Sequence, residues 1–544
     1  MPPNTGDGLE RAKKSDDTNN LLMPISPSSQ DTPSKERKGI VTEEFQGLGG
    51  EDVSCCRAQD DNDRFQTPMY LVICAYIPYI FTFVVSWTRE LIYGVGPLRG
   101  RSRRQFIETS RHGYVPLFAT FENFYVRNMY RRISNAFGNV LSSGPGATIN
   151  VIERISEDDN WTFQLKKTSE IKCINLASNN YLGFAEREGH CIEQAISALT
   201  SNNMSFCSSY QELGRSQLHT ELERTIANYV GVDDSIACGM GFATNAQNIP
   251  CLVSKGCLVM SDEFNHSSIA LGIRLSGATV KVFKHNNSKD LEQTLRRAIM
   301  EGQPRTHQPW KKILVIVEGI YSMDASICCL PEIIAIKKKY GTYLYVDEAH
   351  SIGAIGPNGR GIVDHFGLNP RDVDLLMGTF TKSFGGAGGY IAGSKSLINY
   401  LRMKSPSKIY SNEISPPVAY HIISSLDSII RNDFVGMGRI KNLRMNTRYF
   451  RKRLKQMGFV VYGCIESPLV PVMLFNGAKI PAFVTECLKR GVAVVGVGFP
   501  ATKITEDRLR LCVSASHTKE MLDDALEVIH FVGKYTNCLY NAKA

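Results

Sequence analysis

A single lysine stands between two threonines and a run of glycines in the stretch Gly378-Thr379-Phe380-Thr381-Lys382-Ser383-Phe384-Gly385-Gly386-Ala387-Gly388-Gly389-Tyr390. A partly desolvated lysine loses its proton more readily and can then attack a carbonyl. The threonines offer hydroxyl groups, and the glycines let backbone N–H groups approach an anion closely. An amine beside an anion cradle is the protein half of pyridoxal-phosphate chemistry. Taken alone, the stretch fits a glycine-rich turn with an exposed lysine equally well.

From about residue 150 the sequence alternates between short apolar runs and helical stretches. The apolar runs cover 257–260, 312–317 and 343–346, and helical stretches over 291–300 and 331–340 lie between them. Continuous apolar strands separated by helices predict an α/β fold, in which a mostly parallel sheet is covered by helices on both faces. Ligands in such folds bind beyond the carboxyl ends of the strands. We predict a large domain over 150–430 and a smaller α+β domain over 431–544.

Two of the predicted strands lead into residues that suit a cofactor site. Asp347 ends the run 343–346, and an aspartate there could keep a pyridine nitrogen protonated. His350, three residues further on, could orient a phenolic oxygen or the substrate. His266 follows the run 257–260 and could lie flat on a cofactor ring. Asp347 could instead cap a helix, and a lone histidine in a loop is more often only solvated.

Two further patterns predict contacts to anionic groups. Gly241 and Phe242 belong to a glycine turn that enters a helix, whose first N–H groups can bind phosphate. The turn lacks the spacing of a dinucleotide fingerprint. Arg508 and Arg510 lie on one face of a predicted strand, where a guanidinium could grip a carboxylate in bidentate fashion. Spacing alone favours a solvated strand face.

The first 149 residues divide into three parts. Residues 1–64 are rich in Ser, Pro, Asp and Asn and predict a disordered acidic tail. Residues 65–88 carry no charge over 24 positions, which predicts one transmembrane helix, with a buried or in-plane helix as the alternative. Residues 89–149 form a basic juxtamembrane connector, so the positive-inside rule predicts a cytosolic C-terminal part. The sequons at Asn160, Asn203, Asn265 and Asn286 should then stay unglycosylated.

Composition gives no support to two other classes of function. The net charge is +9 over 544 residues, without a basic patch interleaved with aromatic residues, so nothing favours nucleic-acid binding. The 15 cysteines are scattered and lack zinc-finger spacing. We therefore expect no metal site, and reduced thiols in a domain that faces the cytosol.

Taken together, these stretches resemble the α-oxoamine synthases, which are pyridoxal-phosphate-dependent transferases of fold type I. The similarity runs from about residue 113 to 532. Its motifs keep their order and spacing and comprise 175–183, 262–268, 318–324, 347–351, the lysine stretch and 515–518. Within the family, residues 121–125, 239–245 and 377–385 are similar to the catalytic long-chain-base subunits of eukaryotic serine palmitoyltransferases.

The resemblance implies a role for each matching residue. Lys382 would form a Schiff base with pyridoxal 5'-phosphate and later move protons at the substrate α-carbon. Asp347 would pair with the pyridine nitrogen, His266 would stack on the ring, and His350 would contact the ring oxygen. Thr379 and Thr381 would help hold the phosphate, and Gly241 and Phe242 would contact the cofactor. The residues implied to contact the substrate are Arg510, Asn180 and Tyr181.

The reaction implied by the resemblance is the decarboxylative condensation of L-serine with palmitoyl-CoA, or a related acyl-CoA, to 3-ketosphinganine, the first step of sphingolipid biosynthesis. The family also implies a heterodimer with a homologous subunit that lacks the lysine, and leaves room for small regulatory membrane subunits. The expected location is the endoplasmic reticulum membrane, crossed once, with the catalytic domain in the cytosol.

One region departs from the family pattern. At residues 203–211, just before the helix that contains His219, the early glycines, the arginine and the histidine of the relatives are absent. This departure raises the alternative of a weakened or inactive membrane subunit with an assembly or regulatory role. Retention of Lys382, Asp347, His266 and Arg510 together favours an active synthase. A third reading, aminolevulinate or 2-amino-3-ketobutyrate synthesis, is disfavoured by the predicted membrane segment, because those substrates are soluble.

Overall fold

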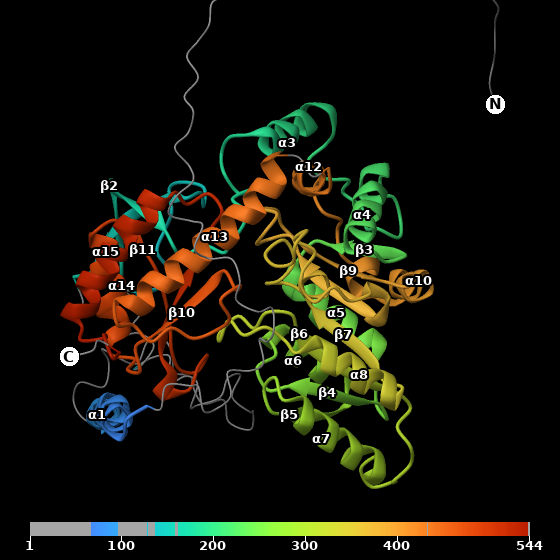
Figure 1. Cartoon of the computed structure of the whole chain (residues 1–544), viewed down its shortest axis with the longest axis horizontal. Coiled ribbons are helices and arrows are strands. Elements are labelled where there is room, and N and C mark those ends of the chain that lie inside the picture. Colours follow the sequence, from blue (N-terminus) through green and yellow to red (C-terminus); the bar gives the residue numbers. More distant parts are fainter. Residues whose placement is uncertain are drawn as a thin grey trace, which may run out of the picture. The chain divides into compact units, whose positions relative to one another are not determined.

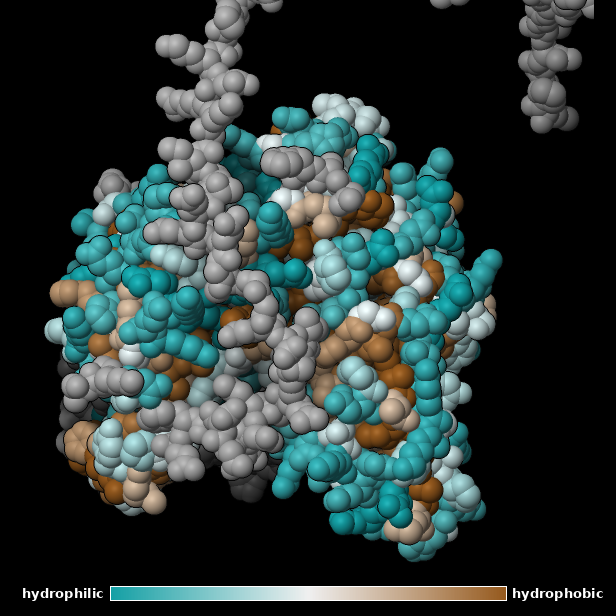
Figure 2. Space-filling model, in the orientation of Figure 1, coloured by the Kyte–Doolittle hydropathy of each residue, from teal (hydrophilic) through white to brown (hydrophobic). Residues whose placement is uncertain are grey.

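The computed structural model describes residues 67–95, 124, 128, 136–157, 162–431 and 434–541. The predicted acidic tail and most of the predicted connector lie outside these residues. The first described element is the apolar helix α1 (Met69–Val95), which includes Pro78 (Figure 1). Over Met69–Ile92 it is long and apolar enough to cross a membrane, and only 17% of its most apolar window is buried. Figure 2 shows apolar side chains gathered on its surface.

One side of α1 contacts the C-terminal part of the chain. Leu71 packs in an apolar cluster with Met473 and Phe475. The Asn476 side chain donates a hydrogen bond to the Cys74 carbonyl at 3.1 Å. The predicted helix over 65–88 is therefore present as a helix, anchored at a few points and otherwise exposed.

Seven strands form the central sheet in the order β3-β9-β8-β7-β6-β4-β5 (Figure 1). Their bounds are Asp234–Cys238 for β3, Leu258–Asp262 for β4, Thr279–Phe283 for β5, Ile313–Glu318 for β6, Tyr343–Asp347 for β7, Leu375–Thr379 for β8 and Gly389–Gly393 for β9. Neighbouring strands pair in parallel from β8 across to β5. In this sheet β9 alone is reversed, pairing antiparallel with β8 and β3. The predicted mostly parallel sheet is confirmed.

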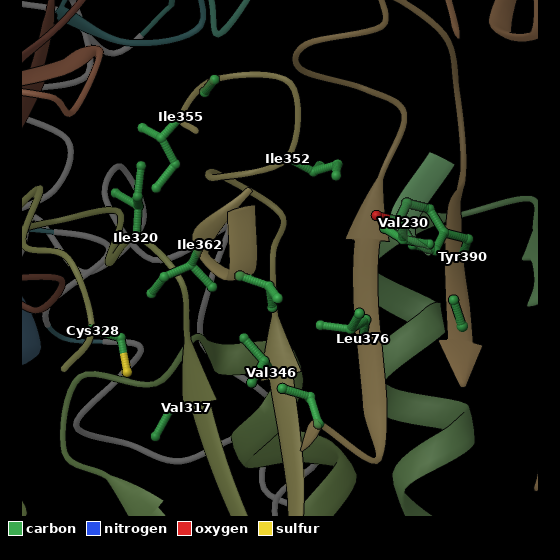
Figure 3. Packing of buried hydrophobic residues seen from close by; sticks show 14 of the residues in the cluster. Val230, Val317, Ile320, Cys328, Val346, Ile352, Ile355, Ile362, Leu376 and Tyr390 are labelled. Atoms are coloured by element: carbon green, nitrogen blue, oxygen red, sulfur yellow. The ribbon is translucent and has the colours of Figure 1, made fainter. Parts of the chain in front are cut away.

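Alternate residues of each strand pack on opposite faces of the sheet, as the pleat requires. In β6, Leu314 belongs to one apolar cluster and Val315 to another. Figure 3 shows Val317, Val346 and Leu376, from three neighbouring strands, within the same cluster. Both faces of the sheet are thus buried from solvent, which explains why these strands have near-continuous apolar sequences.

Helices cover both faces of the sheet. The cluster that contains Leu314 is completed by α5 (Gly241–Leu252), α6 (Ser267–Ser276) and α10 (Lys395–Lys404). The opposite cluster is completed by α4 (Gln217–Val230), α7 (Ser288–Glu301), α8 (Leu330–Tyr340) and α12 (Pro416–Ile430). Local signals set the ends: α4 begins with a capping box at Ser216, and α8 ends at Gly341 in the left-handed conformation. Further helical elements before the C-terminal part are α3 (His190–Ser201), α9 (Ile362–His365), α11 (Pro406–Ile409) and η2 (Pro370–Asp372), and η3 (Ile504–Glu506) lies within that part.

The C-terminal part has its own sheets and core. Strands β10 (Leu469–Met473), β13 (Arg508–Cys512) and β12 (Val495–Val497) pair in the order β10-β13-β12. Helices α13 (Phe434–Gln456), α14 (Lys479–Lys489) and α15 (Lys519–Tyr535) supply apolar residues to the same core.

A hairpin from early in the chain joins this C-terminal part. Strands β1 (Thr148–Ile155) and β2 (Gln164–Asn175) pair antiparallel, and β2 also pairs in parallel with β11 (Val492–Ala493). The sequence had placed residues 150–175 in the large domain. The pairing differs from that expectation because the choice of a distant strand partner leaves no local pattern in the hairpin sequence.

Candidate active site

The carboxyl ends of the parallel strands bring polar side chains to one edge of the sheet. The last residues of β4, β6, β7 and β8 are Asp262, Glu318, Asp347 and Thr379. Lys382 follows three residues after Thr379, in the turn that leads to β9. This is the edge at which α/β sheets bind ligands.

The lysine turn is shaped by buried aromatic residues and glycines. Phe380 and Phe384, on either side of Lys382, are fully buried. The Phe380 backbone N–H donates to the Gly388 carbonyl, and Gly385 and Gly388 have positive φ angles of 64° and 109°. The two aromatic anchors pull the turn into the core, and the glycines allow it to fold back. Lys382 is therefore held in place rather than free on a surface loop.

The Lys382 amine is poised to act as a nucleophile or base. Its pKa is lowered from 10.5 to about 8, mainly by burial, and the nearby positive charge of Arg510 contributes to the decrease. The negative charges of Asp347 and Glu318 act in the opposite direction. At neutral pH a far larger fraction of this amine is unprotonated than of an ordinary lysine.

Asp347 is a buried carboxylate with fixed orientation. Its Oδ2 accepts a hydrogen bond from Asn245 Nδ2 at 2.7 Å, and its Oδ1 accepts one from the Ala349 N–H at 2.9 Å. Asn245 is held in turn by the Tyr345 hydroxyl, which donates to Asn245 Oδ1 at 2.7 Å. A carboxylate fixed in this way can face the pyridine nitrogen of a bound cofactor.

His266 lies beside the same edge with its ring exposed. Its Nδ1 is 2.8 Å from Ser268 Oγ, and the edge of the ring contacts Phe242 at 6.0 Å between centroids. The His266 backbone N–H donates to the Glu318 carboxyl group. Burial, and then the charge of Asp347, raise the pKa of Glu318 well above its ordinary value.

An anion cradle lies where α5 begins. The hydroxyl of Thr379 donates to the Gly388 carbonyl at 2.9 Å and lies 2.8 Å from the Thr381 hydroxyl. A Cβ added at Gly241, the first residue of α5, would lie 2.8 Å from Thr379 Oγ1. The first N–H groups of a helix have no partner within the helix, so they are free to bind phosphate. Side chains and backbone at this point therefore fit the phosphate of pyridoxal phosphate.

The predicted substrate residue Arg510 interacts electrostatically with both Lys382 and Tyr181. The Tyr181 hydroxyl and His350 Nδ1 share a hydrogen bond at 2.8 Å, and burial lowers the pKa of His350 well below its ordinary value. Arg510, on β13, has a buried Nε without a hydrogen-bond partner among the described residues. The Asn180 amide is engaged with backbone, donating to the Pro145 carbonyl at 2.9 Å and accepting from the Ala185 N–H at 3.3 Å. Its contact to substrate stays a prediction.

Two site residues had no role assigned from the sequence. Asn245 orients Asp347, and Glu318 anchors the backbone of His266. Both lie inside stretches 239–245 and 318–324 that matched the family. The only available signal was therefore their place at a helix start and at a strand end. Among the described residues, no cluster of His, Cys, Asp and Glu could hold a metal ion.

The loop over 203–214, which departs from the family pattern, is packed against the chain near residue 412. Ser209 forms a β-bridge with Asn412, and the Ser415 hydroxyl donates to the Met204 carbonyl at 2.8 Å. Gln211 donates to the Arg402 carbonyl at 2.8 Å. The altered sequence therefore still forms a defined loop.

Comparison with known proteins first identifies the protein family to which the chain belongs. A model of the family "Aminotransferase class I and II" matches residues 171–529. The chain therefore belongs to this family of pyridoxal-phosphate-dependent enzymes, which have fold type I. Pyridoxal phosphate is accordingly its cofactor, in agreement with the fit of Lys382, Asp347 and the anion cradle.

The relatives then narrow the class to one group. The chain is 47% identical to serine palmitoyltransferase 2 of Caenorhabditis elegans, over 87% of this chain and 84% of the relative. It is 45% identical to serine palmitoyltransferase 3 of Homo sapiens, over 88% and 86%. It is 48% identical to long chain base biosynthesis protein 2b of Arabidopsis thaliana, over 85% and 96%. The particular proteins it resembles are thus serine palmitoyltransferase subunits of type 2 and 3.

Solved structures agree. The chain matches the serine palmitoyltransferase of Sphingomonas wittichii with a TM-score of 0.63 and 28% identity, over 68% of this chain and 89% of that one. A second serine palmitoyltransferase, described with a pyridoxal-phosphate internal aldimine, matches with a TM-score of 0.65 and 27% identity, over 74% and 94%.

Proposed function

We propose that this chain is the lysine-bearing subunit of a membrane-bound serine palmitoyltransferase. It would condense L-serine with palmitoyl-CoA, or a related long-chain acyl-CoA, to 3-ketosphinganine with loss of carbon dioxide. The observation that carries the proposal is the arrangement of a low-pKa amine at Lys382 with the carboxylate of Asp347 and the guanidinium of Arg510 around it. The identity of more than 40% to serine palmitoyltransferases over most of the chain supports the choice of substrates.

Each of these side chains has a distinct task. Bound pyridoxal phosphate supplies an electron sink for a carbanion. Asp347 keeps the pyridine nitrogen protonated, and Asn245 keeps Asp347 in place. The Lys382 amine takes up and returns the proton at the serine α-carbon. Arg510 binds the serine carboxylate and so sets which bond at the α-carbon lies in the orientation that breaks.

We also propose a membrane location for the enzyme. Helix α1 is apolar and mostly exposed, so its surface suits a bilayer. An anchor of this kind keeps the site beside the membrane in which long acyl chains are delivered. In this proposal the chain crosses the endoplasmic reticulum membrane once and its catalytic domain lies in the cytosol. It forms a heterodimer with a homologous subunit that lacks the lysine, and small regulatory membrane subunits can bind to this heterodimer. The sequons at Asn160, Asn203, Asn265 and Asn286 test the orientation, because glycosylation of any of them would show that the C-terminal part lies on the opposite side of the membrane.

The activity is tested on the protein purified with and without the homologous subunit. Visible absorption is recorded before and after addition of L-serine, and products from acyl-CoAs of several lengths are measured by mass spectrometry. We expect a band of lysine-bound cofactor that shifts with serine and is absent from Lys382→Ala. Formation of 3-ketosphinganine by the wild-type complex, and its loss in the variant, would support the proposal.

A second candidate is a non-catalytic subunit that keeps the fold for assembly. The departure at residues 203–211 favours it, because the corresponding segment lies near the active site in relatives. The absence of the lysine-bound band, even with the homologous subunit present, would establish this candidate and exclude the first.

A further inference from the structure

Arg510 lies between two buried anchor points on the same face of β13. Strand residues two apart share a face, so Arg508, Arg510 and Cys512 point away from Leu509 and Leu511. The two leucines lie in the core of the C-terminal part, whereas Cys512 lies in the apolar core of the large sheet. One face of β13 is therefore docked on the large sheet at the residues before and after Arg510.

The anchor at Arg508 is a fully buried ion pair. Arg508 is 1% exposed, and its Nη1 donates to the Met323 carbonyl at 3.0 Å and to the Asp324 carboxylate. Its Nε and Nη2 donate to Glu506, to the carbonyl at 2.8 Å and to Oε2 at 3.0 Å. Glu506 belongs to the same part of the chain as Arg508, but Asp324 lies in the loop after β6. The bonds to Met323 and Asp324 thus link β13 to the sheet that carries Lys382.

The loop that carries Asp324 is itself fixed. Ala325 has a positive φ of 56°, and a Cβ added at Gly463 would lie 2.6 Å from the Ala325 Cβ. Ser326 Oγ is 2.8 Å from His285 Nε2, and His285 Nδ1 is 2.9 Å from Asp262 Oδ1 at the end of β4. The loop is therefore held rigidly against the end of β4, and the position of Asp324 relative to the sheet is fixed.

We propose that Asp324 is a positioning residue for serine binding. It holds Arg508, which holds β13, so that the Arg510 guanidinium meets the serine carboxylate in bidentate geometry. The inference rests on the proposed function of Arg510. Removal of the Asp324 charge leaves buried Arg508 with Glu506 as its remaining carboxylate partner, which belongs to the same part of the chain, so β13 loses its ionic bond to the large sheet and relaxes. A displacement of about 1 Å is enough to weaken a bidentate contact and reaction geometry.

The test uses the complete enzyme with its homologous subunit and compares Asp324→Asn, the milder Arg508→Lys, and Arg510→Lys. Asp427→Asn is the matched control, because Asp427 forms an exposed pair with Arg431. Serine affinity is read from the spectral shift of the cofactor, and KM is measured separately for serine and for acyl-CoA. We expect Asp324→Asn and Arg508→Lys to raise the serine Kd and KM about tenfold, with the acyl-CoA KM and cofactor content unchanged.

Three outcomes would overturn the inference. Wild-type serine affinity in both Asp324→Asn and Arg508→Lys, with Arg510→Lys impaired, would show that Arg510 acts without this anchor. An equal loss for serine, acyl-CoA and cofactor content would show that the pair has a structural role alone. If Arg510→Lys itself bound serine normally, the proposed function of Arg510 would fall, and the inference with it.

Discussion

The side-chain amide of Asn245 and the carboxylate of Asp347, on a helix and a strand 102 positions apart, are joined by a hydrogen bond of 2.7 Å between Nδ2 and Oδ2. The same amide accepts the Tyr345 hydroxyl, so its orientation is set from both ends. The only charge in this chain of three groups is on Asp347. A neutral helix residue therefore determines where that charge points.

We expect Asp347→Asn to lower kcat by a hundredfold or more, because the cofactor nitrogen loses its anionic partner. Asn245→Ala should cost less, about tenfold, which matches ~1.5 kcal/mol, the lower end for one lost hydrogen bond to a charged group. Steady-state kinetics with serine and palmitoyl-CoA would measure both, and cofactor content serves as the folding control. Equal losses in the two variants would contradict a supporting role for Asn245.

The lowered pKa of Lys382 predicts the pH dependence of cofactor uptake. Only the unprotonated amine reacts with the cofactor, so the protonated form that predominates below the pKa is inactive. The rate at which apoprotein binds pyridoxal phosphate covalently should rise about tenfold per pH unit below pH 8 and level off above it. An ordinary lysine would continue to rise towards pH 10.5.

The charge of Arg510 is part of the same prediction, because it lowers the pKa of Lys382. In Arg510→Gln the midpoint of the rate profile should move to higher pH. Absorbance at the wavelength of the lysine-bound cofactor, followed from pH 6.5 to 10, measures both profiles. Identical midpoints in the two proteins would show that the charge of Arg510 does not affect the pKa of Lys382.

The cradle at the start of α5 predicts a loss of cofactor affinity in Gly241→Ala. The new Cβ would lie 2.8 Å from Thr379 Oγ1, which would have to move away from its position beside Gly388. We expect cofactor affinity to fall about tenfold, since the phosphate donors are displaced. Gly438→Ala on α13 is the control, because its Cβ has no neighbour within 4 Å. It should leave affinity unchanged and stabilise the helix by ~0.5–1 kcal/mol.

A buried charge with no assigned role in cofactor or substrate binding predicts a loss of stability. Lys408 is fully buried, with its Nζ 2.6 Å from Glu413 Oε1 and 3.4 Å from Glu223 Oε1. Lys408→Met leaves the two carboxylates short of a positive charge and should cost ~3–5 kcal/mol. Denaturant unfolding measures the change, with Lys489→Met, from an exposed pair, expected to cost under ~1 kcal/mol. A loss of the same size at both positions would contradict a special stabilising role of the buried Lys408 pair.

The features that sequence predicted are those with local causes. Lys382 could be found from the threonines and glycines beside it in the sequence, and Asp347 because it follows an apolar run, which is recognisable from its own residues. The reversal of β9 could not, because its direction depends on a turn whose shape comes from burial of Phe380 and Phe384. The pairing of Asn245 with Asp347, and of Arg508 with Asp324, depends on contacts between segments more than 100 positions apart. Such contacts have no periodic signature.

The pairing of β2 with β11 has a consequence for the order of folding. During synthesis the hairpin of β1 and β2 leaves the ribosome long before β11 exists, so the two residues of β2 that pair with β11 have no strand partner on that side while the whole central sheet is made. Exposed strand edges invite pairing with other chains. The end of β2 at Ile174 and Asn175 therefore stays open to pairing with other chains until Val492 and Ala493 have been synthesised.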